Sequence, residues 1–145
     1  MLFRSNYGCH WLTNVSAMAE GFASAVLIRA AIPVAGLDAI RSARAKSKRD
    51  TELLSGPGRL SAGLGIDSRH YGIDLLDPRS ELHLVPGRGP ERLLVSTRIG
   101  LAPGKGEELP WRFLHPEWVA WSSTPRFRGG VEVAGVDGTC SGTRA

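Results

Sequence analysis

The sequence is poor in the features that mark metal centres, disulfide frameworks and membrane spans. Its two cysteines, Cys9 and Cys140, lie near opposite ends of the chain, so neither a zinc site nor a disulfide framework is indicated and a reducing compartment is expected. Four histidines are dispersed without metal-ligand spacing, which argues against a zinc centre or a catalytic triad. The longest apolar run, residues 23–37, is broken by Arg29 and Pro33 and is too short to cross a bilayer. Because no charged-then-apolar leader begins the sequence, the cytoplasm is the expected location.

The composition that remains is that of one folded domain with a mild basic excess. The chain has 145 residues, 42% of them hydrophobic, and a domain of this length buries roughly two thirds of its unfolded surface. Eighteen Lys and Arg against 14 Asp and Glu give a net charge of +4. Five cations and no acid lie in RSARAKSKR, residues 41–49. This segment is either a solvated helix end with its loop or a patch that faces phosphates.

Hydrophobic patterning predicts a mixed α+β domain in which strands outnumber helices. Alternating or β-branched residues predict strands at 2–5, 10–17, 24–30, 81–85 and 92–101, and a strand-like segment with a proline break at 110–121. The first two strands are joined through Asn6-Tyr7-Gly8, which favours a hairpin. The continuous apolar run at 24–30 predicts a buried strand.

Two helices are expected between the third and fourth strands. Apolar residues recur at helical spacing over residues 34–45. A shorter helix is expected within residues 53–66, with Ser55 as its cap and Pro57 in its first turn.

Three features could carry chemistry. Tyr7 lies at a tight turn, Arg29 ends an apolar strand, and Gly-Pro-Gly-Arg at residues 56–59 opens a helix. The last of these is not a nucleotide-binding phosphate loop, because the Gly-Lys-Ser/Thr ending is absent. No composite nucleophile accompanies them.

In this order the features resemble the alkyladenine (methylpurine, or 3-methyladenine) DNA glycosylases, monofunctional enzymes of base-excision repair. The matching blocks are YGCHWLTN (7–14), AVLIRA (25–30), SGPGRLSAGLGI (55–66), STRIGL (96–101), LPWRF (109–113) and EWVAW (117–121). The resemblance implies a single α+β domain with a curved, mostly antiparallel sheet, a protruding β-hairpin and a few helices. It divides the chain into a partial family domain at 1–121 and a loose Gly/Ser/Thr-rich tail at 122–145.

The hairpin tip is implied to contact DNA. Tyr7 matches the wedge that enters the minor groove and fills the gap left by a flipped nucleotide, which offsets part of the few kcal/mol that base extrusion costs. Gly8 beside it lets the backbone approach the duplex. Cys9 and His10 lie where the family makes groove and backbone contacts, although Cys9 replaces the usual methionine. The alternative is an ordinary turn tyrosine.

The resemblance also implies a base pocket and a water-positioning pair. Asn14 matches the asparagine that disfavours guanine; otherwise it is a strand-end asparagine. Arg29 matches the arginine that positions the attacking water, and we expect it in a largely buried site, where a guanidinium needs an anion; the alternative is a strand-end arginine with its charge in solvent. Ile99 matches the residue whose carbonyl also holds that water, and its side chain is expected in the core.

Further blocks are implied to hold DNA or to fill the core. Gly58 and Arg59 match a helix start that grips a DNA phosphate, and plain helix capping is the alternative. Trp111, Phe113 and Trp118 are expected in the core rather than stacked on bases.

The family's catalytic carboxylate lies in a Glu-x-x-Ala-Tyr type motif, in a front portion after which this sequence is expected to start. No such motif occurs in the chain, so little activity is expected from it alone. The implied partner is double-stranded DNA with a damaged purine; no cofactor, metal or membrane is implied, and a monomer is expected, associated with the nucleoid if the source is bacterial. Three interpretations stay open: a repair hydrolase whose front end is missing, a non-catalytic DNA-binding remnant, and a module that binds RNA or structured DNA.

Overall fold

The computed structural model describes residues 2–6, 10–16, 18–19, 21–22, 24–122 and 130–134, the first of these ranges by its backbone only. The chain divides into two compact units. One comprises Met1–Val85 and Ala120–Arg126, and the other Pro86–Val119 and Phe127–Ala145. Each holds one three-stranded antiparallel sheet. The predicted α+β class and the antiparallel pairing are therefore confirmed.

The sheet of the first unit is built around the predicted hairpin. Strands β1 (Leu2–Asn6) and β2 (His10–Ser16) pair antiparallel, and β3 (Ala25–Leu27) pairs with the other edge of β2. The hairpin prediction is confirmed, because two alternating strands on either side of a short turn pair with each other most easily. Tyr7, Gly8 and Cys9 at its tip lie outside the described residues.

The predicted buried strand at 24–30 is wrong in length and in burial. Only Ala25–Leu27 is strand, and Val26 in its centre is 55% exposed. In the described part of the chain β3 pairs on one side only, with β2. Beyond it the backbone departs to form an isolated antiparallel bridge between Ala30 and Ser55. Because β3 lies at the edge of the described sheet, its side chains have few neighbours to pack against and stay exposed although they are hydrophobic.

Helix α2 (Pro57–Gly63) begins at a glycine and a proline, both suited to that place. Gly56 precedes it with φ of 124°, a backbone conformation in which a residue with a Cβ would be strained. Pro57, with φ already helical and no N–H to satisfy, occupies the first turn. The prediction that Ser55 caps this helix is wrong, since Ser55 is buried at the bridge with Ala30.

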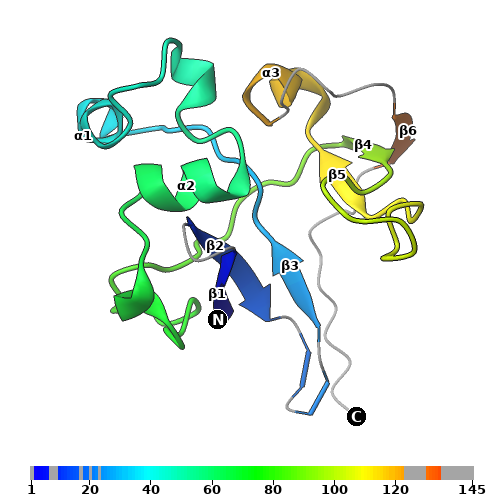
Figure 1. Ribbon diagram of the computed structural model, residues 1–145, viewed down its shortest axis with the longest axis horizontal. Helices are drawn as coiled ribbons and strands as arrows, with labels where there is room; N and C mark the ends of the chain where they lie inside the picture. The colour runs from blue at the N-terminus through cyan, green and yellow to red at the C-terminus, as the bar shows by residue number, and fades with distance from the viewer. Residues whose placement is uncertain are drawn as a thin grey trace. The chain divides into compact units, whose positions relative to one another are not determined.

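The core of the first unit lies where α2 packs beside β2 (Figure 1). Leu60 of α2 and Ile66 are buried there against Trp11 and Ile28. A second cluster joins Ile40 of helix α1 (Leu37–Ala43) to Leu53 and Leu54. Two short 3-10 helices complete the unit, Asp50–Glu52 and Ser68–His70.

The sheet of the second unit has the order β5-β4-β6. Its strands are β4 (Arg92–Ser96), β5 (Arg112–Leu114) and β6 (Val131–Ala134), and a 3-10 helix follows β5 at Pro116–Trp118. Helix α3 (Val119–Ser122) continues from that turn. Strand β6 falls within the segment predicted as a tail, so the division at residue 121 stays a prediction.

The strand predicted at 81–85 is wrong. The segment has turn and irregular backbone, and the Leu84 N–H donates to the carbonyl of Leu75 at 2.8 Å. Leu84 and Val85 are exposed. The alternation of apolar and polar residues in this segment is short, and Pro86, directly after it, has no N–H to donate to a neighbouring strand.

No helix within the described residues is long and apolar enough to cross a membrane.

Candidate nucleic-acid interface

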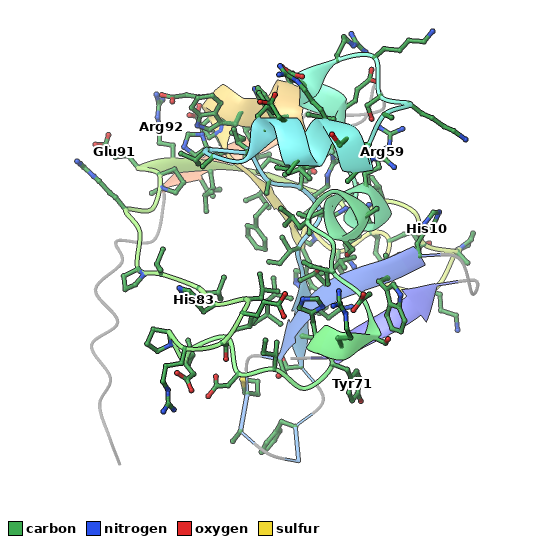
Figure 2. The ribbon with its side chains drawn as sticks, turned by 90° about the vertical axis from the view of Figure 1, so that its left-hand side faces the viewer. His10, Arg59, Tyr71, His83, Glu91 and Arg92 are labelled. Carbon is green, nitrogen blue, oxygen red and sulfur yellow. The ribbon has the colours of Figure 1, made fainter. Side chains whose placement is uncertain are left out.

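The end of the hairpin at which His10 pairs with Asn6 touches the start of helix α2. A Cβ built on Gly58 would lie 3.1 Å from the His10 Cγ atom and 3.2 Å from its Cβ atom. His10 itself is exposed, as is Arg59, the next residue of α2. Figure 2 shows both side chains on the same side of the first unit. The missing side chain at Gly58 therefore lets a hairpin residue and a helix cation share one surface.

A buried pair of hydroxyls holds this arrangement together. The Thr13 and Ser61 side-chain oxygens lie 3.1 Å apart and join β2 to α2. Ser61 Oγ also donates to the Pro57 carbonyl at 3.3 Å. Sequence reasoning missed both residues. The available signal was strand alternation: Trp11, Thr13 and Val15 are alternate residues of β2 and therefore point to the same face, the one that packs on the helix.

Asn14 follows Thr13 in β2, and Arg29 lies two residues beyond the end of β3. The Ile28 N–H donates to the Thr13 carbonyl at 2.9 Å and continues the β2–β3 register by one residue. Ile28 packs in the core with Leu60, and successive side chains of an extended chain alternate in direction. The hydrogen bond from Ile28 places the backbone next to Arg29 beside β2.

Arg29 is anchored by its backbone and is partly buried, and its expected water-positioning role stays a prediction. Its carbonyl accepts the N–H of Gly56 at 2.9 Å, so a residue two positions after β3 anchors the loop entering α2. Asn14 is also half-buried, and its side-chain N–H reaches the Leu12 carbonyl only at 3.5 Å, at the limit of a hydrogen bond.

The basic segment at 41–49 is partly neutralised by acids that flank it. Arg41 donates two hydrogen bonds to Asp50, at 2.7 and 3.0 Å, and one to Asp38 at 3.2 Å. Arg49 donates to Glu52 at 2.6 and 2.9 Å. The hydrogen bond from Arg41 lowers the pKa of Asp50, and that from Arg49 lowers the pKa of Glu52. For these two arginines the interpretation as a solvated, internally paired surface is favoured.

Two other arrangements bear on the site. A cavity of about 350 Å³ opens beside the end of β2, but its lining includes Val15 and Leu75 and neither Asn14 nor Arg29. Among the described residues, no three His, Cys, Asp or Glu side chains are grouped so as to hold a metal ion.

These segments were compared with known proteins. The model of the family described as methylpurine-DNA glycosylase (MPG) matches residues 2–118. The chain belongs to this family. The match covers β1 to β5 and hence every residue for which the resemblance implied a role.

Curated relatives of this family member include three bacterial proteins named "Putative 3-methyladenine DNA glycosylase". The protein from Carboxydothermus hydrogenoformans is 45% identical over 109 residues, which is 74% of this chain and 55% of the relative. The protein from Rhodopseudomonas palustris strain HaA2 is 43% identical over 112 residues, 77% of this chain and 53% of the relative. The protein from Chlorobium luteolum is 39% identical over 107 residues, 74% of this chain and 53% of the relative. The chain spans about half the length of the curated relatives it matches.

In the first unit of this family member, His10 lies against Gly58, next to Arg59, and the Arg29 carbonyl accepts the Gly56 N–H; a shared site with Asn14 stays a prediction. Tyr7, Gly8 and Cys9 lie outside the described residues. Ile99 follows β4 in the second unit, where its side chain is half-buried. Its expected meeting with Arg29 around one nucleotide stays a prediction.

The aromatic residues of the second unit correct a further expectation. Trp111, Phe113 and Trp118 are 63%, 62% and 42% exposed, so they do not form a core in the described structure. The Arg98 guanidinium lies 5.9 Å from the centre of the Trp111 ring, a cation–π contact.

Proposed function

We propose that this chain is part of a base-excision repair DNA glycosylase that hydrolyses the N-glycosylic bond of alkylated or deaminated purines after the nucleotide has been flipped out of the duplex. The observation that carries the proposal is the family match over residues 2–118. The gathering of His10, Arg29 and Arg59 in one unit supports it, because these are positions for which the resemblance implied contact with DNA or water.

In the proposed reaction, water attacks the sugar carbon while the bond from that carbon to the purine breaks and the purine leaves with the bonding electrons. The transition state is oxocarbenium-like. Arg29 and the Ile99 carbonyl hold the water, Asn14 excludes guanine from the pocket, and Tyr7 occupies the space left by the flipped nucleotide. No metal or cofactor takes part.

The proton of the water needs a base, and this sequence contains no Glu-x-x-Ala-Tyr motif. Arginine stays protonated at any working pH and a backbone carbonyl is too weak a base. General-base assistance is worth about 10²–10⁴ in rate. We therefore expect the 145-residue chain, assayed alone, to bind a lesion-containing duplex and to release the base slowly or not at all. Binding without base release is also what the second candidate function, a non-catalytic DNA- or RNA-binding remnant, requires.

The test uses the purified chain with a duplex that contains one hypoxanthine, the same duplex without it, and an RNA of equal length. We expect the lesion duplex to bind most tightly. Tyr7→Ala should abolish that preference, whereas Tyr71→Ala should not, because Tyr71 is an exposed tyrosine of the 3-10 turn far along the chain. Equal affinity of the wild-type chain for all three nucleic acids, or a preference for RNA, would refute the repair assignment. Rapid base release would refute the need for a carboxylate from the motif.

The role of Arg59 has its own charge-matched control. Arg59→Gln removes one cation from α2, and Arg79→Gln removes one from an exposed pair with Asp77. If Arg59 contacts a phosphate, only its replacement should weaken binding to every duplex. The same replacement should reduce the slope of log binding constant against log salt concentration by about 1. Equal effects of the two variants would indicate a general charge effect and no specific contact.

A further inference from the structure

The basic segment, which the proposed function leaves unused, forms a loop with both ends held in place. Arg41 donates two hydrogen bonds to Asp50, nine residues further along the chain, at 2.7 and 3.0 Å. Leu53, soon after the loop, is buried in one cluster with Ile40 of α1. An exposed ion pair contributes little by itself, so the buried packing fixes the two ends and the ion pair closes them. Residues 44–48, here called the basic loop, lie between these ends.

The lysines of the basic loop, Lys46 and Lys48, are exposed. The acids that flank the loop are already bound by the arginines at its ends. Among the residues that the structure describes, neither lysine ammonium lies within ion-pair distance of a carboxylate. An ammonium group binds phosphate as a point charge and needs no fixed orientation to do so. The basic loop therefore offers two positive charges to an anion from outside the chain.

The basic loop meets the candidate nucleic-acid interface at Arg59. Hydrogen bonds from Arg49 lower the pKa of Glu52, and the charge of Arg59 contributes to the same shift. Arg59 therefore lies near the ion pair that follows the basic loop. Figure 2 shows Arg59 on the same side of the first unit as His10, which touches Gly58. A polyanion that contacts Arg59 is thus within reach of the loop.

We propose that Lys46 and Lys48 bind phosphates of the DNA backbone on one side of the lesion and extend the contact made by Arg59. The choice of duplex DNA as the partner rests on the proposed function. Phosphate contacts position a protein on the duplex and carry no information about the bases. The basic loop therefore adds affinity for DNA, and the preference for a damaged purine comes from other residues.

The test measures binding of the full 145-residue chain to the hypoxanthine duplex and to the same duplex without the lesion, over a series of salt concentrations. Lys46→Gln and Lys48→Gln should each weaken binding to both duplexes about two- to fivefold, the range for one exposed ion pair. Each should reduce the slope of log binding constant against log salt concentration by about 0.9. The ratio of the two affinities should stay that of the wild type.

The remaining lysine of the chain supplies the matched control. Lys105 is exposed and lies in the second unit, so Lys105→Gln should bind both duplexes like the wild type. Circular dichroism of all three variants should match that of the wild type, because each replaced side chain is exposed.

A second measurement shortens the duplex stepwise from one end at a time, with the hypoxanthine kept in place. The basic loop meets the interface at Arg59, so its phosphates should lie on one side of the lesion. Shortening from that side should abolish the effect of Lys46→Gln, and shortening from the other side should leave the effect unchanged.

Several outcomes would overturn the proposal. Wild-type affinity and salt slope in both lysine variants would show that the basic loop is only a solvated surface. Equal weakening by Lys105→Gln would show a general charge effect, and an effect of the two lysines on RNA alone would show a different partner. Failure of the proposed function gives a different result. In that case the wild-type chain would have no preference for the lesion, although the dependence on Lys46 and Lys48 could persist.

Discussion

The buried contact between Thr13 and Ser61 predicts an asymmetric pair of mutational effects. Both residues are nearly inaccessible, at 6% and 1% exposure, and their oxygens lie 3.1 Å apart. The two hydroxyls differ in their other partners. Ser61 also donates to the Pro57 carbonyl at 3.3 Å, whereas the only described partner of the Thr13 hydroxyl is Ser61.

Removing Ser61 therefore costs more than removing the Thr13 hydroxyl. Ser61→Ala strands a buried hydroxyl, a change that costs about 1–3 kcal/mol. Thr13→Val removes one hydrogen bond at nearly constant volume and leaves Ser61 its bond to Pro57, at a cost of about 0.5–1.5 kcal/mol. In the double variant no hydroxyl is stranded, so its cost should be smaller than the sum of the singles by about 0.5–1.5 kcal/mol.

Urea unfolding of the three variants, followed by circular dichroism, measures these differences in the free energy of unfolding. In a thermal melt, each 1 kcal/mol should lower Tm by about 2–4 °C for a chain of this size. Additive effects in the double variant would refute the contact. A larger cost for Thr13→Val than for Ser61→Ala would refute the assigned partners. Agreement would show that β2 and α2, which carry the candidate DNA contacts, are coupled through this pair.

Two further predictions concern stability. Gly63→Ala should lower the free energy of unfolding, measured in urea, by about 1–2 kcal/mol, because the added Cβ meets the buried Leu54 side chain. Overpacking costs about 1–3 kcal/mol, and the better helix propensity of alanine offsets up to about 1 kcal/mol of this. A stabilised variant would contradict the packing. The hydrogen bonds from Arg69 lower the pKa of Asp67 to about 2. The contribution of Asp67 to the free energy of unfolding is thus present above its unfolded pKa of about 3.9 and is lost as the pH falls from about 4 to 2. Asp67→Asn should flatten the fall in urea midpoint over that window, and an unchanged pH profile would contradict this.

Local features were the predictable part of the fold. The hairpin follows from two alternating strands separated by the turn-favouring sequence Asn6-Tyr7-Gly8, and both determinants lie within a few residues of each other. The start of α2 follows from Pro57, whose ring sets a helical φ without any distant contact. The order of the blocks similarly predicted the family that the comparison confirmed.

Burial and charge pairing were harder to predict because they depend on partners far along the chain. Residues 24–30 are apolar enough for a core strand, yet only Ala25–Leu27 forms a strand, at the edge of the described sheet, and Val26 in it is 55% exposed. The cations at 41–49 look unopposed in sequence, but the fold of the following turn brings Asp50 back onto Arg41.

The sequence by itself determined the family, the hairpin and the proline in the first turn of α2, because each is encoded by residue type at short spacing. Only the tertiary structure decided which of those residues meet. His10 reaches Gly58 because a glycine leaves room beside the hairpin, and the Arg29 carbonyl accepts the Gly56 N–H, which ties the chain after β3 to the start of α2. Tertiary structure also left Phe113 of β5 exposed, since burial is set by what packs on a side chain and not by its own hydrophobicity.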